Sequence, residues 1–300
     1  ILFWVYRDFD FTKAGDVLLH GTNWWWMLFS LVFGVFAQVF RGWRWRQTLE
    51  PLDAFPKKSD CVNAIFISYA ASLVVPRIGE VSRCGVLAKY DNVSFAKSLG
   101  TVVTERLVDT LTILLITGIT VLLQLPIFVT FLQQTGTKIP SLVHLILFCF
   151  IGVAILLYYL RKTLFFYERV KGFVLNIWEG IMSLKGVRNI PLFIFYTLAI
   201  WACYFLHFYF TFYCFAFTAH LGILAALVMF VGGTFAVIVP TPNGAGPWHF
   251  AIISMMMLYG VNVTDAGIFA LIVHGIQTFL VVLLGIYGFA ALSFTNRHRG

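Results

Sequence analysis

Charged side chains of both signs gather in two short stretches of an otherwise apolar sequence. They are Arg77, Glu80, Arg83, Glu105, Arg106 and Asp109. Buried in an apolar medium, each such charge is costly unless it is paired or wetted, so each is a candidate for binding. The guanidinium groups of Arg77 and Arg83 suit a phosphate, because the planar fork can bond two of its oxygens at once.

A closed ion-pair network is the structural alternative for the same residues. Glu105 and Asp109 are four residues apart and share a helical face, and Arg106 can reach Asp109 at a spacing of three. In this network Arg77 pairs with Glu105 or Asp109, and Arg83 pairs with Glu80. We expect a binding role beside the structural one, because the ends of broken helices present unpaired N–H and C=O groups.

A second candidate site is the proline- and glycine-rich run 239–249. Its candidate residues are Pro240, Pro242, Asn243, Gly244, Gly246 and His249. Such a run cannot continue a helix, and apolar stretches flank it, so it must be buried in protein or line a wet cavity. The backbone N–H groups of Gly244 and Gly246 are predicted to hold an anion. Further along, His274 and Gln277 are expected to face the bundle interior.

The spacing of the residues gives little support for a metal site, a redox site, a nucleotide-binding site or a catalytic site. His207, His249 and His274 are scattered without metal-ligand spacing, which favours hydrogen-bonded packing over a metal site. The cysteines show no zinc or redox spacing, and the glycines fit neither a Walker nor a dinucleotide motif. There is no catalytic arrangement of Ser, His, Cys or paired carboxylates. We therefore expect a protein that is not an enzyme and that uses no metal and no cofactor.

The composition indicates the environment in which these residues must work. The 300 residues are 60% hydrophobic and 11% charged, and the mean hydropathy is +0.88. Soluble domains carry about 25% charged residues. The chain is therefore predicted to be a polytopic α-helical membrane protein. Its net charge of +8 is then a sign of cytoplasmic loops, not of a nucleic-acid partner.

The apolar stretches set the expected topology. Residues 1–6 resemble the end of a truncated first span, and the complete spans are predicted at 24–43, 98–125, 140–160, 191–214 and 266–292. Two more apolar stretches, 61–90 and 221–260, are each interrupted by a Pro/Gly break. These two can be drawn either as spans or as re-entrant hairpins, which return to the side from which they enter.

The distribution of Lys and Arg favours the hairpins. With hairpins, nearly all basic residues fall on one side, in 41–60, 77–97, 161–188 and the C-terminus. Arg7, Lys13 and Lys138 then lie on the other side. With spans, the basic residues divide more evenly. The positive-inside rule therefore predicts two re-entrant hairpins and a cytoplasmic C-terminus.

The predicted fold is an all-α polytopic membrane protein with about six spans and two re-entrant hairpins, arranged as an inverted-topology repeat. The first repeat, 1–125, contains the truncated span, span 24–43, hairpin 61–90 and span 98–125. The second, 126–300, contains span 140–160, span 191–214, hairpin 221–260 and span 266–292. Residues 164–184 are predicted to form an amphipathic helix on the cytoplasmic surface. A plain solvated connector helix is the alternative for that segment.

The motifs resemble the lysylphosphatidylglycerol synthase transmembrane-region family, also called flippase-like integral membrane proteins. The resemblance is carried by Pro76-Arg77-x-Gly79-Glu80-x-x-Arg83, by Thr101-Val102-Val103-x-Glu105-Arg106-x-x-Asp109, by the basic segment 41–46 and by Pro240-Thr241-Pro242-x-Gly244-x-Gly246. The chain departs from the family pattern at Asn243, Trp248-His249 and Val273-His274. The resemblance implies the lipid-translocating half of a synthase without its soluble aminoacyl-transferase domain.

The leading hypothesis is a lipid flippase in the bacterial inner membrane that holds an anionic or zwitterionic headgroup between the two hairpins. Arg77 and Arg83 would contact the phosphate, while Glu80, Glu105 and Asp109 would balance charge or bind a headgroup amine. An ion gradient, the membrane potential or the lipid gradient would drive transport, because the chain has no nucleotide-binding motif. The alternatives are a membrane-embedded transferase acting on lipid-linked sugars or aminoacyl lipids, and a non-transporting subunit of an envelope lipid assembly.

Overall fold

The computed structural model of the protein describes residues 2–7, 9–126 and 186–295, and every regular element in these ranges is helical. The principal helices are α1 (Leu2–Val5), α2 (Phe11–Asp16), α3 (Trp24–Leu49), α4 (Lys58–Val74), α5 (Ile78–Tyr90), α6 (Phe95–Leu123), α10 (Ile190–Tyr209), α11 (Ile223–Ala236), α12 (Pro247–Leu258) and α13 (Val263–Thr295). Short turns of other helical types join them, at Val17–Gly21, Glu50–Leu52, Phe210–Cys214 and Pro242–Gly244.

Four helices in the described part of the chain are long and apolar enough to cross a membrane. They are Trp24–Leu52, Phe95–Leu123, Ile190–Cys214 and Val263–Phe294. The spans predicted at 24–43, 98–125, 191–214 and 266–292 are thereby confirmed as long apolar helices. The span predicted at 140–160 and the amphipathic helix predicted at 164–184 lie outside the described residues.

Helix α3 is longer than its apolar stretch suggests. It begins after Asn23, whose side-chain oxygen accepts a hydrogen bond from the backbone N–H of Trp25 at 3.2 Å, as an N-cap does. It continues to Leu49 instead of ending at 43. Arg41 lies just before this extension and Arg44 lies on it, and both are buried inside the bundle. The helix therefore continues through these two arginines, and no loop begins at them.

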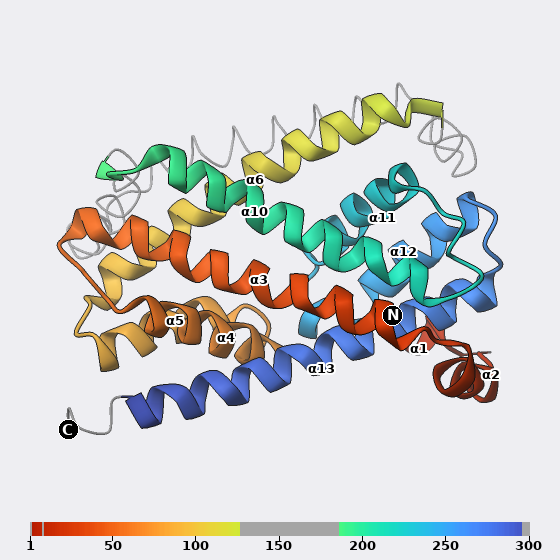
Figure 1. Ribbon diagram of the computed structural model, residues 1–300, viewed down its shortest axis with the longest axis horizontal. Coiled ribbons are helices and arrows are strands. Elements are labelled where there is room, and N and C mark those ends of the chain that lie inside the picture. The colour runs from red at the N-terminus through yellow and green to blue at the C-terminus, as the bar shows by residue number, and fades with distance from the viewer. Residues whose placement is uncertain (1, 8, 127–185, 296–300) are drawn as a thin grey trace, which may run out of the picture.

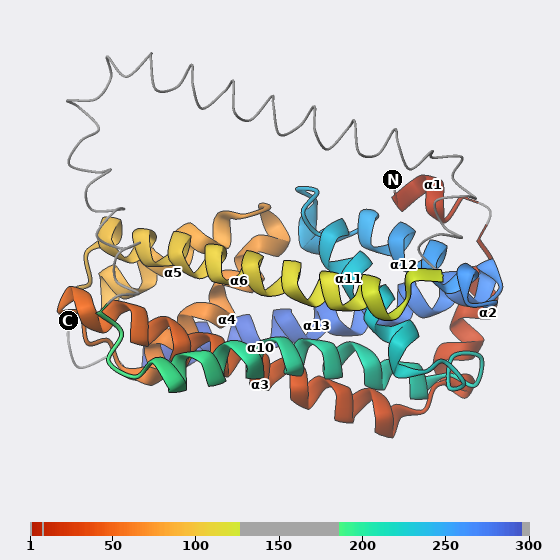
Figure 2. The same cartoon turned by 90° about the horizontal axis from the view of Figure 1, so that it is seen from above.

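The long helices α3, α6, α10 and α13 run along the longest axis of the molecule (Figure 1), and the view from above shows the same arrangement (Figure 2). The pair α4 and α5 lies toward one end of this axis, and the pair α11 and α12 lies toward the other. Helix α3 packs against α10. Helix α4 packs against α13 and helix α11 against α6, so each helix pair contacts a long helix from the other half of the chain.

Both helix pairs are interrupted where the sequence predicts a break. Between α4 and α5 the backbone of Arg77 adopts a left-handed conformation, with φ of 65°. Between α11 and α12 the residues with positive φ are Asn243, Gly244 and Gly246, with φ of 51°, 74° and 94°. A residue with a side chain rarely adopts this conformation, which places a strained tip in each pair.

Helices α4 and α5 approach each other closely at Gly79, at the start of α5. A methyl group there would overlap the carbonyl oxygen of Ser68 and the hydroxyl of Ser72 on α4. We expect Gly79→Ala to destabilise the protein by about 1–3 kcal/mol, the usual cost of overpacking. Gly85 on the same helix has open space around its Cβ position. Gly85→Ala is thus expected to be neutral or stabilising by up to about 1 kcal/mol. Thermal unfolding in detergent measures both, and equal midpoints would contradict the close approach of α4 and α5.

Candidate functional site

Two adjoining cavities lie between the two interrupted helix pairs. The smaller has a volume of about 180 Å³ and the larger about 320 Å³. Tyr69, Arg106 and Val237 line both cavities, so the two share a wall. The smaller one is bounded by both breaks, because its lining includes Pro76 and Arg77 from the first and Pro240, Thr241, Asn243 and Gly244 from the second.

Charged side chains line the smaller cavity. The Nε atom of Arg106 lies 2.8 Å from a carboxylate oxygen of Glu80, and both side chains are about two-fifths exposed, at 43% and 40%. Arg77 is exposed, and its Nη2 donates a hydrogen bond of 2.9 Å to the carbonyl oxygen of Ile238 at the second break. The tips of the two helix pairs are thus in direct contact. With two guanidinium groups and one carboxylate, this cavity carries an excess of one positive charge.

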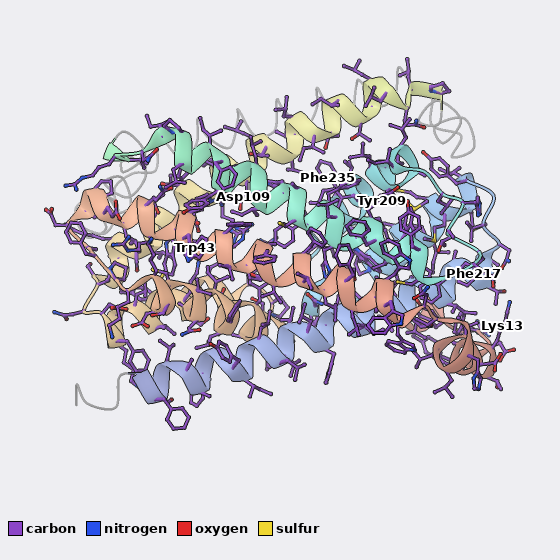
Figure 3. The ribbon with its side chains drawn as sticks, viewed as in Figure 1. Lys13, Trp43, Asp109, Tyr209, Phe217 and Phe235 are labelled. Atoms are coloured by element: carbon purple, nitrogen blue, oxygen red, sulfur yellow. The ribbon has the colours of Figure 1, made fainter. Side chains whose placement is uncertain are left out.

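A second group of charges is fully buried beside this cavity, and we call it the ion-pair cluster. Asp109 on α6 accepts from Arg41 and from Arg44 on α3, both at 2.7 Å. Arg83 on α5 lies 2.6 Å from Glu105, which is also 3.7 Å from Arg44. Figure 3 shows Asp109 among α3, α6 and α10, away from both ends of the bundle. The cluster therefore ties α3, α5 and α6 together with three arginines and two carboxylates.

Aromatic side chains complete the surroundings of the cluster. The guanidinium of Arg83 lies over the ring of Trp45 at 4.6 Å, and the Trp45 indole N–H donates to the hydroxyl of Thr101 at 2.9 Å. Arg41 lies 5.7 Å from the ring centroid of Tyr204, whose hydroxyl is 2.9 Å from that of Tyr69. Because Tyr69 and Tyr204 also line the larger cavity, the cluster is the immediate backing of the cavity wall.

The pairing in the cluster differs from the one predicted from the sequence. Arg83 pairs with Glu105 and not with Glu80, and Arg77 pairs with neither Glu105 nor Asp109. The predicted approach of Arg106 to Asp109 is present, although at 3.8 Å it is long. The pairing differs because α3 supplies two buried arginines, which take Asp109, and Glu105 is left to Arg83. Arg83, at 1% exposure, belongs to the cluster and lines neither cavity.

The prediction that the backbone N–H groups of Gly244 and Gly246 hold an anion is wrong. The N–H of Gly244 donates to the carbonyl of Thr241 at 3.1 Å. The N–H of Gly246 donates to Nδ1 of His249 at 3.2 Å. Both donors are therefore used within the second break. These bonds close the turn into α12 and leave the cavity to side chains.

The remaining candidates from the second half hold this turn in place. The ring of His274 lies 3.0 Å, through Nε2, from the carbonyl oxygen of Asn243, and the Asn243 amide donates to Thr278 at 2.7 Å. The ring of the buried His249 lies 4.6 Å from that of His274. His207 lines the larger cavity, and its Nδ1 lies 2.8 Å from the carbonyl oxygen of Ser30. The three histidines thus bond to backbone groups.

The structure gathers only part of the predicted site around the cavities. Six of the predicted residues line the smaller cavity: Arg77, Glu80, Arg106, Pro240, Asn243 and Gly244. Gln277 lines the larger one. Sequence reasoning missed Arg41, Arg44, Tyr69, Trp201 and Tyr204. A signal existed for the two arginines, because their spacing of three puts both on one helical face, where Glu105 and Asp109 need partners.

A family model described as the lysylphosphatidylglycerol synthase transmembrane region matches residues 1–285. The chain belongs to this family. The membership confirms the resemblance that the charged motif and the proline-rich motif indicate. No curated protein and no solved structure matches the chain.

Family membership and the four long apolar helices together establish the setting of the site. The chain is an integral membrane protein, and its family is connected with membrane lipids. The matched residues include both breaks, the whole ion-pair cluster and the lining of both cavities. The charges described above therefore lie in the family's shared transmembrane region.

Proposed function

We propose that the protein is a flippase that moves a lipid with an anionic or zwitterionic headgroup across the bilayer. The observation that carries this proposal is a pair of adjoining cavities, of which the smaller lies between the two helix breaks and is lined by Arg77, Arg106 and Glu80. A guanidinium binds phosphate oxygens with strong, charge-assisted hydrogen bonds. A phosphate headgroup would use Arg77 and Arg106, whereas Arg83 would stay in the cluster.

The helix pairs are suited to be re-entrant hairpins. Helices α4 and α5 have 17 and 13 residues, and α11 and α12 have 14 and 12. A helix needs about 20 residues to cross the hydrocarbon core. The pairs lie toward opposite ends of the molecule and touch at Arg77 and Ile238. Two hairpins that enter from opposite sides and meet at mid-depth have this arrangement.

The packing of each hairpin against a helix from the other half of the chain supports the inverted repeat. Helix α4 of the first hairpin packs against α13, and α11 of the second packs against α6. In an inverted repeat, each hairpin would contact the last span of the other repeat in this equivalent way. Rocking of the two halves about the α3–α10 contact would expose the cavities to one side and then to the other.

The break regions also suit a lipid as the cargo. Val74 and Val75 at the first break and Ile238 at the second are exposed apolar side chains that line neither cavity. Charged residues on the cavity side and apolar residues on the outside would let the headgroup enter while the acyl chains remain in the bilayer. The distribution of Lys and Arg supports a cytoplasmic C-terminus.

Filling the shared wall of the cavities tests the proposal. Val237 lines both cavities and is 48% exposed, while Val81 on α5 is also 48% exposed and lines neither. We expect Val237→Trp to slow translocation severalfold by occupying the headgroup path, and Val81→Trp to leave the rate unchanged. The measurement is the loss of inner-leaflet protection of a fluorescent phospholipid in proteoliposomes.

The result depends on two comparisons. Wild-type protein must move the lipid faster than protein-free vesicles, and both tryptophan variants must unfold in detergent at the wild-type temperature. A wild-type rate equal to that of empty vesicles for phospholipids, aminoacyl lipids and polyprenyl-linked sugars would refute the flippase. Product formed from a labelled donor would instead identify a transferase.

A further inference from the structure

The two cavities differ in chemistry, and the larger one carries information about the headgroup. Among the described residues that line it, Arg106 is the one with a permanent charge, and no Asp or Glu is present. Aromatic rings form much of its wall, including Trp201, Tyr204, Phe230 and Trp248. Its volume of about 320 Å³ is within the range of pockets that hold small ligands.

Hydrogen-bond donors without a partner point to what this cavity takes. The indole nitrogen of Trp201 and the amide nitrogen of Gln277 are buried and have no hydrogen-bond partner among the described residues. Trp201 is only 9% exposed. The hydroxyl of Thr241, which lines the smaller cavity, is also buried without a hydrogen-bond partner among the described residues. A buried polar group left unpaired costs about 1–3 kcal/mol, so these groups call for a ligand that offers oxygen atoms.

The absence of a carboxylate among the described lining residues disfavours a cationic group in the larger cavity. An ammonium group there would have no carboxylate partner in the lining and would face the guanidinium of Arg106. Glu80, the acidic residue of the smaller cavity, already lies 2.8 Å from Arg106. Unpaired donors and a positive charge therefore favour an uncharged group with several oxygens, whose apolar faces can pack on the aromatic rings.

We propose that the headgroup is a lipid phosphate that carries an uncharged, hydroxyl-bearing group, a polyol or a sugar, and not an aminoacylated or other cationic group. The phosphate lies in the smaller cavity at Arg77 and Arg106. The hydroxyl-bearing group lies in the larger cavity and accepts hydrogen bonds from Trp201 and Gln277. This inference rests on the proposed headgroup path, but it concerns binding and can be measured without transport.

The test is thermal unfolding of the purified protein in detergent with short-chain lipids at matched concentrations, because a ligand that binds the folded state stabilises it. The lipids are phosphatidylglycerol, a glucosyl polyprenyl phosphate, phosphatidic acid, phosphatidylethanolamine and lysylphosphatidylglycerol. We expect a hydroxyl-bearing lipid to bind about thirtyfold more tightly than the other three, since two added hydrogen bonds each contribute about 1 kcal/mol. The first two lipids separate a glycerophospholipid source from a polyprenyl one.

Two variants and a matched control locate the effect. Trp201→Phe keeps an aromatic ring but removes the N–H, and Gln277→Leu removes the amide. Each is expected to weaken binding of the preferred lipid severalfold and to leave phosphatidic acid binding unchanged. Trp43→Phe is the control, because Trp43 packs against Phe40 and Tyr196 and lines neither cavity (Figure 3).

The outcomes separate this inference from the flippase itself. Equal binding of all five lipids, tightest binding of lysylphosphatidylglycerol, or no binding at all would overturn the headgroup assignment. A preference that persists in Trp201→Phe and Gln277→Leu would also overturn it. The expected preference without translocation in vesicles would uphold the headgroup assignment and refute the flippase.

Discussion

Replacing Asp109 with alanine is expected to destabilise the protein by about 3–5 kcal/mol, the usual cost of removing one partner from a buried ion pair. Asp109 accepts from Arg41 and Arg44 at 2.7 Å each. Both guanidinium groups are buried, at 3% and 0% exposure, and would lose their main counter-charge. The remaining carboxylate, Glu105, cannot replace it, because it already lies 2.6 Å from Arg83.

Two further variants separate charge from volume. Asp109→Asn keeps nearly the same size but removes the charge, so it should cost almost as much as Asp109→Ala. Asp265→Ala breaks the Lys13–Asp265 pair, which is 2.9 Å long with Lys13 47% exposed. An exposed pair contributes about 0–1 kcal/mol. Thermal unfolding in detergent measures the stability of all three variants. If Asp109→Asn destabilised the protein no more than Asp265→Ala, the buried charge of Asp109 would not stabilise the fold as we expect.

The elements of this fold were predictable because local rules determine them. Apolar stretches of sufficient length fix the four described spanning helices, and proline and glycine fix both breaks. Each interrupted pair begins and ends within a few residues of its expected bounds: α4 and α5 fill 58–90, and α11 and α12 fill 223–258. The family assignment followed from the spacing of the charged residues on these elements.

The partners of those charges were not predictable in the same way. Arg41 and Arg44 follow an apolar run, and a sequence rule reads such arginines as the start of a cytoplasmic loop. In the structure α3 continues through them, because the carboxylates of α6 lie opposite. Which charge meets which depends on how α3, α5 and α6 pack, and periodicity within one helix carries no such information.

The prediction that backbone N–H groups of the second break bind an anion was wrong for a related reason. A glycine-rich turn at a helix start has free N–H groups by default, which favours an anion site. Here the His249 ring, three residues beyond Gly246, accepts one of them. The local sequence allows either a side-chain acceptor or a ligand, and the histidine rotamer decides between them.

Within the cavities, the Arg106–Glu80 pair is expected to control how tightly an anionic lipid binds. Arg106→Gln should lower the rate of translocation of an anionic lipid about tenfold to a hundredfold, because a hydrogen bond to a charged group contributes about 1.5–3 kcal/mol. The variant also leaves the Glu80 carboxylate unpaired, at 40% exposure, where it would repel the phosphate. Arg46→Gln is the matched control, since Arg46 pairs with Glu50 at 3.0 Å and lines neither cavity.

Glu80→Gln should act in the opposite direction on binding. In the wild type a phosphate must compete with Glu80 for Arg106, which lies 2.8 Å away. Removing the carboxylate charge should therefore lower the lipid concentration that gives the half-maximal rate. It should also lower the maximal rate, because an anion held by an uncompensated arginine leaves more slowly. Rates at several lipid fractions in proteoliposomes separate the two effects.

The combined variant decides whether the two side chains act on the lipid through their charges. Glu80→Gln/Arg106→Gln has the same net charge as the wild type and lacks the repelling carboxylate of Arg106→Gln alone. It should therefore bind an anionic lipid more tightly than Arg106→Gln and less tightly than Glu80→Gln. If Glu80→Gln and Arg106→Gln instead impair half-saturation equally, the pair holds the cavity together and does not bind the headgroup. The order of the four proteins thus distinguishes a binding site from a structural ion pair.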